Sequence, residues 1–201
     1  MKLIAIVGTN STRSTNRRLL QFIQAHFKEQ AEIDICEIAD LPAFNEPDDK
    51  TAPAEVQALS DKIVAADGVI ISTPEYDHSI PAVLKSAIEW LSYTTRPLID
   101  KPVMITGASL GALGSSRAQA HLRQILDAPE VKARIMPSAE FLLGHSMQAF
   151  DDQGQLIDQD KVAELDDCFN EFLLFVKITN QLVDASSTAK ERATTFSWEQ
   201  A

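Results

Sequence analysis

The chain has 201 residues, 45% hydrophobic and 23% charged, which suits one globular domain with its own core. Its formal net charge of −11 argues against a nucleic-acid or anionic-membrane binder, because phosphate contacts need clustered Lys and Arg. The sequence also lacks an apolar run of the ~20 residues that span a bilayer, and it shows no signal-peptide pattern. We therefore expect a cytoplasmic protein that does not contact membranes.

Apolar runs and helical periodicities alternate along the first third of the chain. They predict strands over residues 3–7, 33–38 and 68–72, and helices over 16–27 and 54–66. Residues 33–38 alternate with period two, so this strand is expected to have one wetter side and to lie at a sheet edge. Prolines at 42, 47 and 53 mark the segment between as a loop.

The same alternation continues to about residue 178. The pattern predicts a helix over 81–91, a strand over 102–106, a helix from Ser115 or Ser116 to about 126, a strand over 133–136 that resumes toward Phe141, and a long final helix. Pro81 suits a first helical position, and either serine can cap the next helix. Leu165, Phe169, Phe172, Leu173 and Val176 form the apolar stripe of the final helix.

Five strands with interleaved helices indicate an α/β doubly wound parallel sheet, because parallel strands need crossover connections. With strand order 2-1-3-4-5 and helices on both faces, the loops after strands one, three and four meet at one edge. We expect one domain over residues 1–179, followed by a polar tail over 180–201.

The loop after the first strand, residues 8–16, suits an anionic group. A helix N-terminus offers unpaired N–H groups and the positive end of a dipole. Hydroxyls and an amide can add donors and one side chain can add charge: Thr9, Ser11, Ser14, Thr15, Asn16 and Arg13. The loop lacks the dinucleotide and P-loop glycine patterns and a phosphatase cysteine. The alternative is a well-capped helix without a ligand.

The loops after strands three and four suit a flat ligand. Pro74 stiffens the first of them, and Tyr76 can stack on a ring. Glu75, Asp77 and His78 are a candidate acid/base set, although adjacent loop residues rarely converge on one atom and His78 can equally face solvent. In the other loop, Gly107, Gly111 and Gly114 accompany Ser109, and glycine lets a ring or a backbone approach closely. A phosphate cradle beside two such loops describes a mononucleotide cofactor such as FMN.

The motifs in these loops carry a resemblance to a known family. In order, the chain contains Gly8-Thr9 with Ser14 and Asn16, then Thr73-Pro74-Glu75-Tyr76, the helix over 81–91, the run to Gly111 and the segment 121–126. Over roughly residues 2–178 the chain resembles the NAD(P)H-dependent FMN reductases of the flavodoxin-like fold. That family includes quinone, chromate and azo-dye reductases.

Carried over by position, the resemblance implies a set of cofactor-binding residues. They are Thr9, Asn10, Ser11, Arg13, Ser14, Thr15 and Asn16 for the phosphate, Pro74, Glu75, Tyr76, Asp77 and His78 for the ring, and Ser109 and Gly111 as a third contact. Three positions differ from the family pattern, which commonly has Ser at 9, Arg at 11 and Asn at 77. Arg13 is the candidate to replace the charge expected at position 11.

The resemblance implies an oxidoreductase that passes electrons from NADH or NADPH through FMN to a small acceptor: a quinone, an azo compound, free flavin or a metal oxyanion. Ping-pong kinetics follow, and no residue is assigned as a catalytic acid or base. A homodimer or homotetramer is implied, with Leu84, Ile88 and Trp90 either at the interface or in the core. Two alternatives remain: a flavodoxin-type electron carrier, and a module whose tail around Phe196 and Trp198 recruits a protein.

Two other features receive ordinary explanations. Cys36 and Cys168 have no metal-ligand pattern around them, so we expect two partly buried thiols and no metal site. Acidic residues crowd the segment from Asp151 to Glu171, but their spacing does not match a calcium loop. We expect a solvated loop and the outer face of a helix there.

Overall fold

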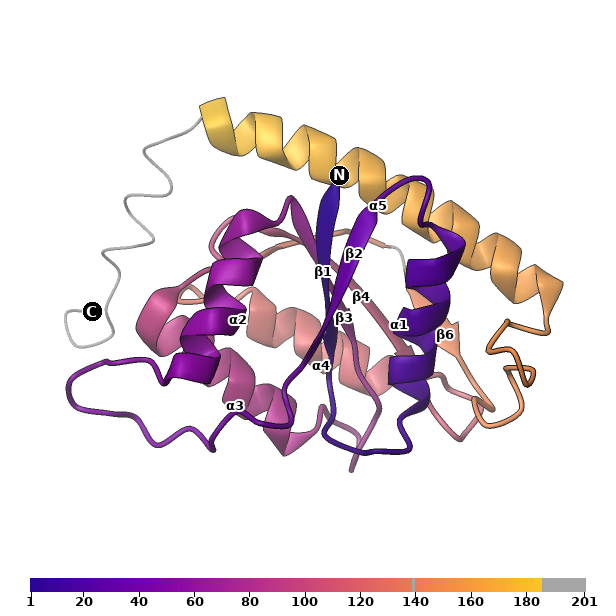
Figure 1. Cartoon of the computed structure of the whole chain (residues 1–201), viewed down its shortest axis with the longest axis horizontal. Coiled ribbons are helices and arrows are strands. Elements are labelled where there is room, and N and C mark those ends of the chain that lie inside the picture. The colour runs from indigo at the N-terminus through magenta and orange to yellow at the C-terminus, as the bar shows by residue number, and fades with distance from the viewer. Residues whose placement is uncertain (139, 186–201) are drawn as a thin grey trace.

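The computed structural model describes residues 1–138 and 140–185, which form a parallel sheet between two layers of helices (Figure 1). The strands are β1 (Lys2–Val7), β2 (Glu32–Glu37), β3 (Gly68–Ser72), β4 (Pro102–Ala108), β5 (Arg134–Ile135) and β6 (Phe141–Leu143). The helices are α1 (Thr15–His26), α2 (Ala54–Ala65), α3 (Ala82–Trp90), η1 (Leu91–Thr95), α4 (Ser116–Leu126) and α5 (Gln159–Ala185). The predicted fold class is confirmed.

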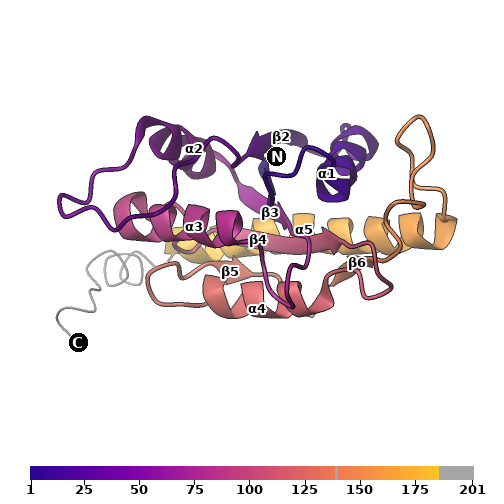
Figure 2. The same ribbon diagram turned by 90° about the horizontal axis from the view of Figure 1, so that it is seen from below.

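The strand order is β2-β1-β3-β4-β5, with every pair parallel, as the crossover argument requires. β2 pairs only with β1 and forms the expected edge. The fifth position is shared by two short strands, because β5 pairs with the start of β4 and β6 pairs with its end. Figure 2 shows β5 and β6 at separate places along that edge.

Successive side chains of the buried strands enter two separate cores. In β1, Ile4 and Ile6 pack with α2, α3 and α4, whereas Leu3, Ala5 and Val7 pack with α1 and α5. This alternation buries both faces of β1, which is why its sequence reads as a continuous apolar run. α5 closes the second core with its predicted stripe, and it runs on past residue 179 to Ala185. The tail residues 186–201 lie outside the described residues.

The three large apolar side chains of helix α3 lie in the core. Leu84, Ile88 and Trp90 are each at most 3% exposed and belong to the core of the chain itself. They are therefore core residues and not the interface residues that the sequence left open. Beyond Trp90 the chain continues as the π-helical turn η1, which periodicity did not predict.

Two predicted caps differ from the structure. Pro81 lies at the N-cap position of α3, one residue before the helix. Ser115 lies at the N-cap position of α4, but its φ is 67° and its side chain makes no capping bond. Its hydroxyl is instead 3.3 Å from the Gln119 amide nitrogen in the buried interior. The cap of α4 comes from another part of the chain, described below.

Gly107 is required by packing at the end of β4. A Cβ built on Gly107 would lie 1.9 Å from the Ser115 hydroxyl and 2.4 Å from the Thr73 carbonyl oxygen. A Cβ on Gly111 would meet nothing within 4 Å. Gly107 thus admits a neighbouring backbone, while Gly111 faces open space.

We expect Gly107→Ala to lower the free energy of unfolding by about 1–3 kcal/mol, the usual effect of overpacking a buried site. Gly111→Ala is the matched control and should leave stability within about 0.5 kcal/mol of the wild type. Urea unfolding of both variants checks this, and equal stabilities would contradict the packing argument.

Candidate functional site

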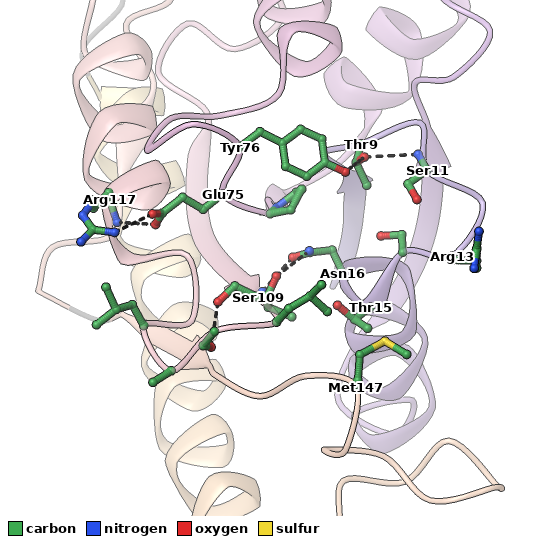
Figure 3. A pocket seen from close by; sticks show the side chains of 17 residues that line it. Thr9, Ser11, Arg13, Thr15, Asn16, Glu75, Tyr76, Ser109, Arg117 and Met147 are labelled. Carbon is green, nitrogen blue, oxygen red and sulfur yellow. Dashed lines mark hydrogen bonds and ion pairs between the residues drawn. The ribbon is translucent and has the colours of Figure 1, made fainter.

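The loops after β1, β3 and β4 enclose a cavity of about 850 Å³ at the carboxyl edge of the sheet (Figure 3). That volume lies within the range of about 300–1,000 Å³ that is usual for ligand sites. Its lining comprises Thr9, Ser11, Arg13, Ser14, Thr15, Asn16, Pro74, Glu75, Tyr76, Ala108, Ser109, Leu110, Gly111, Ala112, Leu113, Arg117 and Met147. The topology brings together the three loops that the sequence singled out.

Asn16, in the first turn of α1, fixes the relative positions of these loops. Its amide nitrogen donates to the Ala108 carbonyl at 2.9 Å, and its amide oxygen accepts from the Ala108 N–H at 2.9 Å. The same oxygen accepts from the Ser72 hydroxyl at 2.8 Å. Asn16 is 1% exposed, so its amide is a buried tie between α1, β3 and β4. These bonds use the amide oxygen and one of the two amide hydrogens. The expectation that Asn16 also donates to a ligand stays a prediction, because an amide nitrogen carries a second hydrogen.

The first loop keeps other donors open toward the cavity. The Ser14 hydroxyl caps α1 by accepting from the Arg17 N–H at 3.1 Å. Among the described residues, the backbone N–H groups of Thr15 and Asn16 have no acceptor. Arg13 is exposed and has no ion-pair partner in the described part of the chain. Unpaired N–H groups at a helix N-terminus beside a free cation form an anion site, and this donor set fits a phosphate.

The side chains of Thr9 and Arg17 hold the shape of the first loop through bonds to Ser11. The Ser11 N–H donates to the Thr9 hydroxyl at 3.2 Å, and the Ser11 carbonyl accepts from Arg17 Nη1 at 2.9 Å. Arg17 also pairs with Glu37 at the end of β2. The sequence does not indicate this role of Arg17, because no local pattern distinguishes an arginine that holds a loop through a contact with a different strand.

Glu75 in the second loop caps helix α4. Its Oε2 accepts the Arg117 backbone N–H at 3.1 Å, and its Oε1 pairs with Arg117 Nη1 at 2.9 Å. Burial alone would raise the pKa of Glu75, but the hydrogen bonds and charge of Arg117 outweigh it and hold the pKa below its ordinary value. At neutral pH Glu75 is therefore a carboxylate held in place by Arg117 and not a proton donor.

Tyr76 connects the second loop to the first. Its hydroxyl lies 3.3 Å from the Thr9 hydroxyl, and Figure 3 shows its ring on the side of the cavity opposite Met147. At 47% exposed, the ring is available to a ligand. Because Thr9 also holds the Ser11 N–H, these contacts form a chain from the second loop to the first.

Asp77 and His78 form the tip of a tight turn and do not line the cavity. The Tyr76 N–H donates to the Ser79 carbonyl and the Ser79 N–H donates to the Tyr76 carbonyl, both at 2.9 Å. φ is 50° at Asp77 and 64° at His78, the pattern of a type I′ turn. Such a conformation costs about 1–2 kcal/mol per non-glycine residue. The turn accounts for the asparagine expected at 77, since Asn adopts this conformation readily.

The third loop is held from outside the three predicted segments. The Ser109 N–H donates to the Leu143 carbonyl in β6, and the Ser146 N–H donates to the Ser109 carbonyl, both at 3.0 Å. The Ser146 hydroxyl also meets the Thr15 hydroxyl at 2.8 Å. The segment after β6 thus brings Met147, 58% exposed, to the cavity beside Leu110 and Leu113. This wall is apolar and open to solvent.

The predicted site residues therefore divide into two groups. Eleven of them line the cavity: Thr9, Ser11, Arg13, Ser14, Thr15, Asn16, Pro74, Glu75, Tyr76, Ser109 and Gly111. Asn10, Asp77 and His78 do not. Of the residues that the sequence missed, Leu110, Ala112 and Leu113 lay within a predicted loop, whereas Arg117 and Met147 carried no local signal.

The thiols and acidic residues give no second site in the described residues. Cys36 and Cys168 are buried, and burial raises the pKa of Cys36 and takes that of Cys168 to about 11. Thiols that resist deprotonation are poor nucleophiles and metal ligands. Residues 1–138 and 140–185 contain no group of three potential metal ligands. Within the same ranges, no helix is both long and apolar enough to cross a membrane.

Replacing Asn16 by Ala should destabilise the fold by about 2–4 kcal/mol, because it leaves the N–H and carbonyl of Ala108 and the Ser72 hydroxyl without partners in a buried site. Asn180→Ala is the control, since Asn180 makes one exposed bond to the Asp67 carbonyl. Its loss should cost under about 1 kcal/mol. Urea midpoints measure both, and similar losses would refute the special role of Asn16.

Glu75→Gln should flatten the acid limb of the stability curve. Because the pKa of Glu75 is lowered in the folded state, its contribution is present above the unfolded pKa and is lost as pH falls through the folded one. The wild type should therefore lose more stability than the variant between about pH 5 and 3, near the ordinary Glu pKa. Urea unfolding across this range tests the sign, and parallel curves would contradict it.

Comparisons with known proteins agree with this geometry. The model of the NADPH-dependent FMN reductase family matches residues 1–148. The NADH:(hydroxy)cinnamate reductase subunit CrdA of Vibrio ruber is 64% identical over 191 residues, covering 95% of each chain. The NADH-dependent flavin reductase subunit 2 of Lactobacillus johnsonii is 46% identical, covering 88% of this chain and 98% of the relative.

A solved structure and a further relative support the same family. The flavoenzyme NAD(P)H:(acceptor) oxidoreductase FerB of Paracoccus denitrificans superposes with a TM-score of 0.78 at 28% identity, covering 89% of this chain and 98% of that one. The quinone reductase of Escherichia coli K12 is 43% identical over 148 residues, covering 70% of this chain and 78% of the relative. These matches confirm FMN as the cofactor and reduced nicotinamide as the donor, and they favour a reductase over a flavodoxin-type carrier. The chain belongs to the NADPH-dependent FMN reductase family and is an FMN-dependent NAD(P)H oxidoreductase that reduces small acceptors.

Proposed function

We propose that FMN occupies the cavity with its phosphate at the first loop and its ring along the second and third. The observation that carries this is the polarity of the lining: hydroxyls, unpaired N–H groups and Arg13 at one side, and Tyr76 with apolar residues elsewhere. When bound, FMN takes a hydride from the nicotinamide and passes electrons to the acceptor. Of the fourteen residues carried over from the family, the eleven in the lining are the proposed contacts.

The chain's own groups would bind and orient rather than exchange protons. N–H groups of Thr15 and Asn16 would meet the phosphate, while Ser109 and Tyr76 would bound the ring. Glu75 and Arg117 are committed to each other, so neither serves as a general acid. Ring-facing backbone dipoles would supply the electrostatic stabilisation, a role that needs no titrating residue.

We further propose NADH as the physiological donor. Two relatives are named for NADH, and the 2′-phosphate of NADPH calls for a free cation. Two arginines line the cavity: Arg117 is paired with Glu75, and Arg13 lies at the phosphate end. The net charge of −11 adds a general repulsion toward the more highly charged dinucleotide.

The acceptor is proposed to be a small planar compound such as a quinone or an unsaturated aromatic acid. The exposed apolar wall of Leu110, Leu113 and Met147 faces the same cavity as Tyr76, and relatives act on (hydroxy)cinnamate and quinones by name. An apolar wall opposite an aromatic ring favours acceptors with a flat ring over metal oxyanions, which have none.

Assembly and location complete the proposal. Two relatives are named subunits, which supports association of this chain, with itself as a homodimer or homotetramer or with a different subunit. The sequence placed the end of the reductase domain at residue 179 and a tail over 180–201; because α5 continues to Ala185, we propose that the domain includes all of this helix. A cytoplasmic location suits the two free thiols and the use of NADH.

Anaerobic titration tests the proposal. The FMN-loaded protein should be bleached by NADH without a second protein, more readily than by NADPH, and 1,4-benzoquinone should restore its absorbance. Initial rates with NADH and benzoquinone should then show the parallel lines of a ping-pong mechanism. Intersecting lines, or bleaching that requires another protein, would argue for a different role.

Arg13→Ala should weaken FMN binding by about 10-fold, the usual effect of losing one charge-assisted contact. Arg18→Ala is the control, because Arg18 lies nearby in the first turn of α1 but contacts the Asp151 carbonyl and the Phe150 ring instead of the cavity. Fluorescence titration with FMN measures both, and equal affinities would remove Arg13 from the phosphate site.

A further inference from the structure

The loop after β3 contains the strained turn over residues 76–79, and helix α4 contacts this turn at both ends. Before the turn, Glu75 is bonded to the side chain and backbone N–H of Arg117. At the last residue of the turn, the Ser79 hydroxyl lies 2.7 Å from His121 Nδ1. Arg117 and His121 are four residues apart on α4 and therefore lie on one helical face.

The helix is a firm support for this contact. Ala118 and Leu122, each next to one of the two holding residues, are fully buried in the core between α2, α3 and α4. The turn itself is anchored by two backbone hydrogen bonds, and both of its central residues adopt left-handed conformations. A strained turn persists only where its surroundings hold it, and strain of this kind gathers at functional sites.

The position of the turn decides where the Tyr76 ring lies. Tyr76 is the first residue of the turn, and its hydroxyl reaches Thr9 in the phosphate loop. The Ser79–His121 bond is exposed, so it adds little to global stability. Its effect falls on the local placement of residues 76–79.

We infer that His121 is a positioning residue for the reductase reaction: through Ser79 it fixes the turn over residues 76–79 and so sets the Tyr76 ring against the flavin and the acceptor. This inference rests on the proposed place of FMN beside Tyr76. His121 touches neither ligand in this account, because it does not line the cavity.

The test compares His121→Ala, Ser79→Ala, the double variant and His121→Asn, all as FMN-loaded protein. His121→Asn keeps a polar atom near the position of Nδ1. Each alanine variant should raise the KM for 1,4-benzoquinone by roughly 3- to 10-fold with kcat little changed, the size expected for one net hydrogen bond. The double variant should be no worse than either single one, and His121→Asn should recover most of the loss.

His26→Ala is the matched control. His26 Nε2 makes an equally short exposed contact, 2.7 Å to Asp166, on the far end of α1. Its loss should leave the KM for benzoquinone at the wild-type value. The second readout is hydrogen exchange in the flavin-free proteins, where the Tyr76 and Ser79 amides should exchange faster in His121→Ala and Ser79→Ala but not in His26→Ala.

The two proposals fail in different ways. If wild-type protein binds FMN and is bleached by NADH, but His121→Ala keeps the wild-type KM and amide exchange, the positioning role is overturned and the flavin site stands. Single effects that multiply in the double variant would also overturn it, because they would show separate actions of Ser79 and His121. If the wild type binds no FMN, the flavin site and the positioning role fall together.

Discussion

The buried amide of Asn16 is the interaction on which the site depends. It satisfies both backbone groups of Ala108 and the hydroxyl of Ser72, so one side chain ties the first turn of α1 to the ends of β3 and β4. Buried polar groups must be paired, and a fully satisfied set defines one arrangement and excludes slippage between elements. The three loops that line the cavity are thereby fixed relative to one another.

From Asn16 outward, the loops are linked to one another rather than merely adjacent. Thr9 receives the Ser11 N–H and lies beside the Tyr76 hydroxyl, and Glu75 caps α4 through the Arg117 N–H. The Thr9–Tyr76 and Glu75–Arg117 links join elements that are 67 and 42 residues apart in sequence. A cavity built in this way is largely formed before a ligand arrives, which lowers the ordering cost of binding.

Sequence periodicity was sufficient for the fold and for the loops of the site, because buried parallel strands and crossover rules leave few topologies. It was insufficient where a group acts across the chain. Ser115 is of a residue type that commonly caps helices. The cap of α4 is instead Glu75, which lies 42 residues before its partner Arg117. Likewise, the sequence indicated Asn16 as a ligand donor but not its bonds to Ala108 and Ser72, which tie together elements far apart in the chain. Met147 reaches the cavity only because β6 ends there, which no local pattern encodes.

The division of the fifth sheet position between β5 and β6 has a consequence for how such an enzyme can change over evolutionary time. The segment that carries Met147 follows the last strand and is held by Ser146 hydroxyl and backbone contacts. The wall side chains Leu110, Leu113 and Met147 are exposed and belong to neither core. Substitutions in this wall can therefore accumulate at little risk to folding. New acceptor preferences can arise there while the first loop and the N-terminus of α1 stay unaltered.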